Sequence, residues 1–262
     1  MRGGWWNSRA FDLAQFAAFV ALLLWAVLRG ADAMAYNGQW YRVPRLLWRV
    51  VDGDVIWGPL VKGLIVTVQI SLWATALALA IGLVAALLRL STSYSGRYLS
   101  IAYIELVRNT PLLVQLYVFY FILAPILGVP RFWTGVIALA AFEGAFAAEI
   151  IRAGILSIGQ GQWDAASALG LSRWRSYRLV VLPQAFRIML PPLAGVLVSL
   201  IKHSAIVSVI AVFDLTNEAR NVISDTFMSF EIWFTVAAIY LALTVSLSAG
   251  IGILERRLAV GR

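Results

Sequence analysis

The sequence has no cysteine, which excludes disulfide bonds, thiolate metal sites and a cysteine nucleophile. It has a single histidine, His203, which argues against a multi-histidine metal site within the chain. No stretch fits Gly-x-x-x-x-Gly-Lys-Ser/Thr, the loop that cradles nucleotide phosphates. A membrane-embedded enzyme would need a nucleophile with a base, or clustered metal ligands. These absences make an enzyme a poor interpretation of the chain.

Charged residues are also scarce, at 13% of the 262 residues, whereas hydrophobic residues make up 61%. An ordinary soluble domain has about twice that charged share. This much apolar surface cannot be hidden in a water-soluble core of 28.8 kDa, and it excludes a disordered chain. With a mean hydropathy of +0.84, the composition predicts an all-α, polytopic helical membrane protein.

Six apolar stretches are long enough, or nearly so, to cross a bilayer, which takes roughly 20 residues. Continuous apolar runs of this length are helices rather than barrel strands, because barrel strands alternate and backbone groups in lipid must pair within the segment. The six stretches are residues 11–28, 63–88, 112–129, 132–151, 188–213 and 232–254.

The net charge of +8 has a simple explanation in this setting, since basic residues collect in cytoplasmic loops and no nucleic-acid partner is needed. With a cytoplasmic N-terminus, thirteen arginines fall inside and seven basic residues outside. This bias predicts that both termini lie in the cytoplasm. The arginine-rich residues 41–51 weaken the bias, and we expect them to form an interfacial helix on the outer surface.

The first apolar stretch has a second interpretation. Arg2 and Arg9, the apolar run and the small residues around Ala33 could form a signal peptide. Arg29 interrupts the approach to that cleavage site, so we favour an uncleaved helix. Residues 1–57 are then an N-terminal extension with one span and a periplasmic segment, ahead of a membrane domain at residues 58–262.

The cytoplasmic residues 153–187 are the most informative segment. We expect two short helices joined at Gly170, because glycine suits the left-handed position after a helix. Ser172 can cap the second helix, and Pro183 is expected to end or bend it. A paired-helix knob of this kind is well shaped to seat in a groove of a partner protein.

This segment resembles the EAA loop of ABC-transporter permeases from bacterial importers, whose pattern is Glu-Ala-Ala, three residues, Gly, nine residues, Ile-x-Leu-Pro. At the same spacing this chain has Asp164 in place of the glutamate and Val180 in place of the isoleucine. The residues that the resemblance assigns to ATPase coupling are Asp164, Ala165, Ala166, Gly170, Leu182 and Pro183.

Residues 105–116, 145–155 and 200–210 resemble further motifs of the polar amino-acid importers. Two residues depart from the third motif: His203, where an acidic or amide residue is usual, and Ala205, where serine is usual. The resemblance runs from about residue 58 to the C-terminus and implies a five-helix type I importer core in the bacterial inner membrane, with one added N-terminal helix.

The resemblance implies import of a polar or charged amino acid by a protein assembly embedded in the lipid bilayer. The assembly consists of a pair of permeases, identical or related, a dimeric ATPase that binds ATP and Mg, and a periplasmic solute-binding protein. No cofactor is expected in this chain. A secondary transporter or channel is the alternative, but it leaves the EAA-type loop without a role.

Ionisable residues inside spans are costly and are candidates for function. Glu149 and Arg152 are three residues apart, so we expect a structural ion pair on one helix face. Glu143 either lines a polar cavity or pairs across helices. The candidates for the substrate path are Glu143, Lys202 and His203, with Asn109, Thr110 and Gln115 as uncharged candidates.

Overall fold

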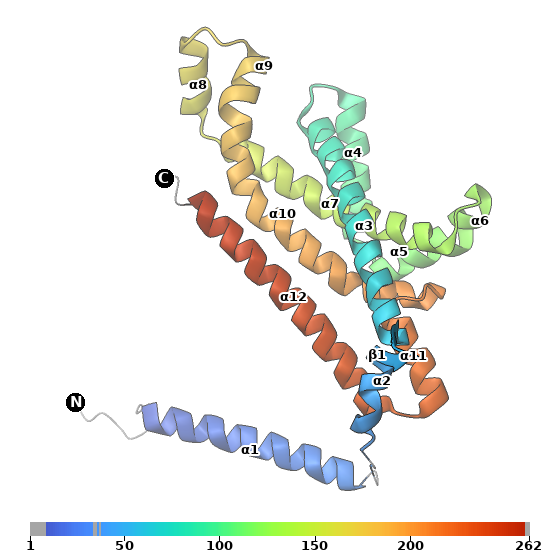
Figure 1. Cartoon of the computed structure of the whole chain (residues 1–262). Coiled ribbons are helices and arrows are strands. Elements are labelled where there is room, and N and C mark those ends of the chain that lie inside the picture. The colour runs from blue at the N-terminus through green and yellow to red at the C-terminus, as the bar shows by residue number, and fades with distance from the viewer. Residues whose placement is uncertain (1–8, 34–35, 37, 260–262) are drawn as a thin grey trace. The chain divides into compact units, whose positions relative to one another are not determined.

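The computed structural model describes residues 9–33, 36 and 38–259 (Figure 1). The chain forms two compact units, Met1–Tyr41 and Arg42–Arg262. The first unit contains α1 (Arg9–Ala33), and the short turn η2 (Trp40–Arg42) joins the two units. The elements of the second unit are α2 (Val43–Leu47), β1 (Trp48–Val51), β2 (Asp54–Trp57), α3 (Pro59–Leu90), α4 (Tyr94–Arg108), α5 (Leu112–Val118), η3 (Phe119–Leu123), α6 (Ala124–Leu127), α7 (Arg131–Leu156), α8 (Gln160–Ala168), α9 (Arg173–Ser176), η4 (Tyr177–Val181), α10 (Leu182–Ser204), η5 (Ala205–Ile210), α11 (Leu215–Thr226) and α12 (Ser229–Ala259).

The described residues contain four helical segments long and apolar enough to cross a membrane, and five if one bent pair counts as a span. The all-α membrane fold predicted from composition is therefore confirmed. In α1 the apolar stretch is Phe11–Val27, at the short end of the spanning range, so the sixth span stays a prediction. The signal-peptide alternative turns on residues around Met34 and Ala35, which lie outside the described residues, as do Arg2 and Arg262 from the charge count.

Small residues bring the two central helices, α3 and α7, into close contact. On α3 they recur at every fourth position, and on α7 a matching series faces them. Spacing of this kind forms a flat stripe along one helix face, which lets two backbones approach and gain dispersion energy. The buried stripes are Ala74, Ala78, Gly82 and Ala86 on α3, and Ala140, Gly144 and Ala148 on α7.

Residues 112–127 reach a spanning length only together with α4, which corrects the sequence-based assignment of residues 112–129 as a span by themselves. Helix α4 is followed by α5, η3 and α6, and the two helical parts meet at an angle of 111°. The sequence interpretation left α4 in a loop because its charged residues lower the hydropathy. Two hydrogen bonds hold it in the core: Ser100 Oγ donates to the Ala85 carbonyl at 2.7 Å, and Tyr103 Oη donates to the Ala141 carbonyl at 2.6 Å.

The interfacial helix expected at residues 41–51 is wrong over most of its length. Only Val43–Leu47 is α-helical, and the chain then enters an antiparallel hairpin in which Trp48 pairs with Trp57. Asp52 and Gly53 form the turn, both with positive φ, as two-residue hairpin turns require. The tryptophan and valines at residues 48–51, which looked like part of one helix face, instead form the first strand of this hairpin.

The stripe contact between α3 and α7 should be sensitive to a single methyl group. A Cβ at Gly82 would lie 2.7 Å from the Ala147 Cβ and 3.1 Å from the Gly144 carbonyl oxygen. We expect Gly82→Val to lower the thermal unfolding midpoint of the detergent-purified protein by several degrees, since overpacking costs about 1–3 kcal/mol. Gly195→Val on α10 is the matched control, because among the described residues no atom beyond its own helix backbone lies within 4 Å of a Cβ at this position. An unchanged midpoint in Gly82→Val would contradict the packing argument.

Candidate functional site

The α8–α9 knob is shaped by a helix C-terminus that closes on itself. The Leu171 N–H donates to the Ala166 carbonyl at 3.1 Å, and the Gly170 N–H donates to the Ser167 carbonyl at 2.9 Å. These two bonds form a Schellman motif, which places Gly170 at the left-handed position with φ of 72°. The expected break at Gly170 is therefore present. Ala166 is buried inside the turn, so a small side chain is needed at that position.

Two contacts hold α8 against η4 and the start of α10. The rings of Trp163 and Tyr177 meet edge to face with centroids 4.7 Å apart. The Gln184 amide donates to the Gln162 side chain at 3.1 Å. As Figure 1 shows, α8 and α9 form one end of the second unit, while α2, β1 and α11 lie at the other. The knob is thus a fixed projection rather than a loose loop.

The exposed residues of the knob combine apolar, basic and acidic groups. Leu169 is 80% exposed and Trp174 is 70% exposed, although both are large and apolar. Asp164 is exposed too, and its Oδ1 accepts a hydrogen bond from Gln160 Nε2 at 3.0 Å. Large exposed apolar residues rimmed by charges are typical of a protein interface.

Two local expectations about the second knob helix need correction. Ser172 stands at the N-cap of α9, but its side chain makes no capping bond; its carbonyl instead accepts from the Ser176 hydroxyl at 3.2 Å. Of the two alternatives expected at Pro183, an end of the helix is wrong, because the helical segment runs on from Arg173 to Ile210. The π-helical turn η4, directly before it, widens the helix where proline lacks an N–H and would crowd the preceding carbonyl.

A polar contact crosses the membrane helices between α7 and α10. His203 Nδ1 lies 2.6 Å from Glu143 Oε1, so the carboxyl group pairs across helices. The Glu143 side chain is 4% exposed, while that of His203 is 38% exposed and lies edge-on to the Phe142 ring. The pair therefore has a buried acidic end and an accessible imidazole end.

The other substrate-path candidates lie apart from this pair or are engaged locally. Lys202 is exposed and forms no ion pair with the described side chains. The Gln115 amide lies 2.7 Å from the Thr110 hydroxyl and 2.8 Å from the Val107 carbonyl, across the break between α4 and α5. Asn109 donates to the Glu105 carboxylate at 3.0 Å. These amides and the hydroxyl thus satisfy the polar groups freed by the bend.

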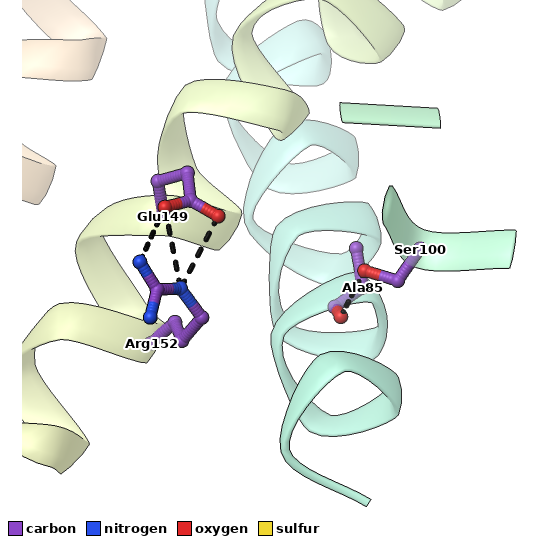
Figure 2. A network of polar contacts seen from close by, with 4 residues as sticks. All are labelled: Ala85, Ser100, Glu149 and Arg152. Atoms are coloured by element: carbon purple, nitrogen blue, oxygen red, sulfur yellow. Dashed lines mark hydrogen bonds and ion pairs between the residues drawn. The ribbon is translucent and has the colours of Figure 1, made fainter. Parts of the chain in front are cut away.

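Glu149 and Arg152 form the expected ion pair within α7, with Arg152 Nη2 2.8 Å from Glu149 Oε2 (Figure 2). A second guanidinium contact, from Nε, also reaches the carboxylate. Both side chains are partly exposed, so we assign little stability to the pair and regard it as local charge compensation. Figure 2 also shows the Ser100 hydroxyl directed at the Ala85 carbonyl.

The sequence interpretation missed a polar cluster at the start of α11. Asp214 is fully buried, and its Oδ1 accepts from the Asn217 N–H at 2.9 Å as a helix N-cap. Its Oδ2 has no hydrogen-bond partner among the described residues. Asn217 and Arg220 both donate to the Ser208 carbonyl, at 3.1 and 2.6 Å. The sequence signal was Asp214 itself, because aspartate is a preferred N-cap residue and a short amphipathic helix follows it, with Asn217 at its third position.

Burial raises the pKa of Asp214 from 3.8 to about 6. A folded-state pKa above the unfolded value adds stability at low pH, and that stability is lost as pH rises through about 6. Asp214→Asn keeps the cap acceptor but cannot ionise. We therefore expect its free energy of unfolding to increase relative to that of the wild type, by up to about 3 kcal/mol, as pH rises from about 4 to 6. The measurement is unfolding of both purified proteins across this range. Parallel pH profiles would contradict the prediction.

Comparisons with known proteins identify the family of the chain. Residues 78–260 match the family described as binding-protein-dependent transport system inner membrane component. The glutamine transport system permease protein GlnP of Escherichia coli K12 is 38% identical over 216 residues, which cover 80% of this chain and 98% of that protein. The probable glutamine ABC transporter permease protein GlnM of Bacillus subtilis is 39% identical over 193 residues, covering 73% of this chain and 89% of that protein.

A solved structure shows the same fold. The crystal structure of an amino acid ABC transporter with histidines has a TM-score of 0.72 and 39% identity, over 76% of this chain and 94% of that one. Because the family match spans more than half of the chain and the relatives align over nearly their whole length, the chain belongs to the inner-membrane permease components of binding-protein-dependent transport systems.

Proposed function

We propose that this ABC importer permease subunit carries a polar or charged amino acid from the periplasm to the cytoplasm. The observation that carries the proposal is the contact between Glu143 and His203, which joins two membrane helices. Ionisable groups at membrane depth are costly, so they persist where they meet a partner or a substrate. The names of the glutamine permeases among the relatives support the same class of solute.

An amino acid presents an ammonium and a carboxylate, so its path needs an acceptor and a donor close together. The Glu143 carboxyl is the acceptor, and the exposed ring of His203 is the donor. Lys202, the residue before His203 on the same helix, offers a cation for the substrate carboxylate. Asn109, Thr110 and Gln115 serve mainly to hold the α4–α5 bend in this proposal.

The permease works with partners that complete the transport cycle. Two permeases, identical or related, stand side by side in the bacterial inner membrane with both termini in the cytoplasm. A separate ATPase dimer binds ATP and Mg on the cytoplasmic side, and a solute-binding protein delivers the amino acid on the periplasmic side. The permease itself contributes no cofactor. Closure of the ATPase dimer shifts the permease pair between its inward- and outward-facing states.

The α8–α9 knob transmits this closure. It projects from the second unit as a fixed pair of short helices, and it presents Leu169, Trp174 and Asp164 to the partner. Its second helix runs directly into α10, which carries His203 at its far end. A displacement of the knob therefore reaches the Glu143–His203 contact through one continuous helical segment.

The coupling proposal predicts that Gly170→Val combined with Asp164→Lys abolishes the stimulation of ATP hydrolysis by the solute-binding protein. Valine is strained at the φ of 72°, and the Schellman turn that sets the knob cannot close around it. Stimulated and basal ATPase rates are measured on the reconstituted complex. Gly161→Ala on α8 is the control, since its added Cβ meets no atom within 4 Å. Stimulation at the wild-type level in the double variant would refute the coupling role.

The substrate-path proposal predicts that His203→Asp shifts transport toward cationic amino acids. Two facing carboxyl groups favour a positive substrate, and a change of about tenfold in the cationic-to-neutral uptake ratio corresponds to about 1.4 kcal/mol. Uptake of a labelled amino-acid panel into proteoliposomes checks this.

Two variants accompany that measurement. Glu143→Gln, which removes the buried carboxylate, should lower uptake with basal ATP hydrolysis retained. Glu149→Gln breaks the other carboxylate pair of α7 and should leave the uptake ratio unchanged. If His203→Asp and Glu143→Gln both transport the panel as the wild type does, the pair does not contact the substrate.

A further inference from the structure

The β1–β2 hairpin exposes an apolar face that the transport proposal leaves unexplained. All eight strand residues are exposed. The register pairs Trp48 with Trp57 and Val50 with Val55, and alternation puts these four side chains on one face. They are 51%, 53%, 65% and 57% exposed in that order, so the whole face is apolar and uncovered. An isolated two-stranded hairpin is only marginally stable in water, so we expect another surface or lipid to cover this apolar face.

The core holds the base of this hairpin firmly. The Gly58 N–H donates to the Leu47 carbonyl at 2.7 Å, and a Cβ at Gly58 would lie 2.1 Å from the Leu46 carbonyl oxygen. Val43 of α2 is buried in a cluster with Leu60 of α3. The hairpin therefore keeps a set position at the first residue of a membrane-spanning helix.

That position places the hairpin at the depth of lipid headgroups. Strand β2 ends at Trp57, two residues before α3 begins at Pro59. The uncharged run of α3 begins after Lys62, so Pro59 lies about 6 Å outside it at 1.5 Å per residue. The headgroup layers add about 5–7 Å on each side of the hydrocarbon core. The hairpin lies at the end of the second unit opposite the α8–α9 knob (Figure 1).

The surrounding charges fit phospholipid rather than a soluble partner. Arg45 and Arg49 are exposed close to the hairpin base. The acidic residues Asp52 and Asp54 lie at the turn, about 10 Å along the strands from the tryptophan pair. Tryptophan with arginine beside the end of a span is the composition of a membrane interface, where the ring sits among headgroups and the guanidinium meets phosphate.

We propose that the face formed by Trp48, Val50, Val55 and Trp57 lies in the headgroup region of the non-cytoplasmic leaflet, with Arg45 on lipid phosphate. The hairpin then sets the depth and tilt of α3, because the two are joined rigidly at Gly58. This interaction does not depend on which solute is carried.

The absence of native cysteine makes a direct test possible, since a single introduced cysteine is the only thiol of the chain. The two probe variants are Val55→Cys on the apolar face and Asp54→Cys on the opposite face. The two positions are adjacent in sequence, and both are exposed. Each variant is labelled with an environment-sensitive fluorophore in the complete complex, and the wild-type complex gives the background from partner thiols. The complex is reconstituted in phosphatidylcholine vesicles with and without an equal part of phosphatidylglycerol.

We expect lipids that carry a nitroxide near the headgroup to quench the probe at position 55 at least about twofold more than the probe at position 54. Aqueous iodide should show the reverse order. Arg45→Gln should remove any gain in quenching produced by phosphatidylglycerol, and added salt should weaken that gain.

Equal quenching at the two positions by both agents would overturn the proposal. It would also be overturned if position 55 became protected from iodide only after the solute-binding protein was added, because the face would then be a protein-docking surface. Uptake of amino acids is measured on the same vesicles. Loss of uptake with lipid quenching intact would count against the proposed function and leave the hairpin proposal standing.

Discussion

The close approach of α3 and α7 is the constraint on which the rest of the membrane unit depends. In a bilayer, burial of apolar side chains between helices gains little, because lipid is as apolar as the protein. Small residues at every fourth position replace that driving force with dispersion contacts between backbones. Gly82 and Gly144 stand at the centre of this contact, and neither has room for a larger side chain on the other helix's surface.

The polar elements of the structure are arranged around that contact. Helix α4 is tied to both central helices, through Ser100 to α3 and through Tyr103 to α7. Helix α10 packs on α7 and brings His203 to Glu143. Since an unpaired carboxyl group in the membrane is costly, the position of α10 and the carboxyl group on α7 support each other. The site is therefore a product of helix packing rather than of a local motif.

The shape of the knob depends on local interactions alone. The left-handed conformation at Gly170, the burial of Ala166 and the two Schellman hydrogen bonds lie within six consecutive residues. No distant contact is needed to produce this turn, and a glycine at its position is the natural signal for it. For this reason the knob was predictable in outline, while the continuous helix through Pro183 was not. The π-turn before the proline has no recognisable residue pattern.

The sequence by itself determined the membrane class, four of the spans, the turn at Gly170 and the pairing of Glu149 with Arg152, because hydropathy, helical period and glycine conformation are all local properties. Only the tertiary structure decided the bend after α4 and the partner of Glu143. Both depend on residues far apart in the chain: Tyr103 bonds to Ala141, and His203 is 60 residues from Glu143. The hairpin before α3 does have a local signal, Asp52-Gly53, which the helical interpretation of residues 41–51 overlooked. A pattern along one helix states which face is polar, but it does not state which other helix will lie against that face.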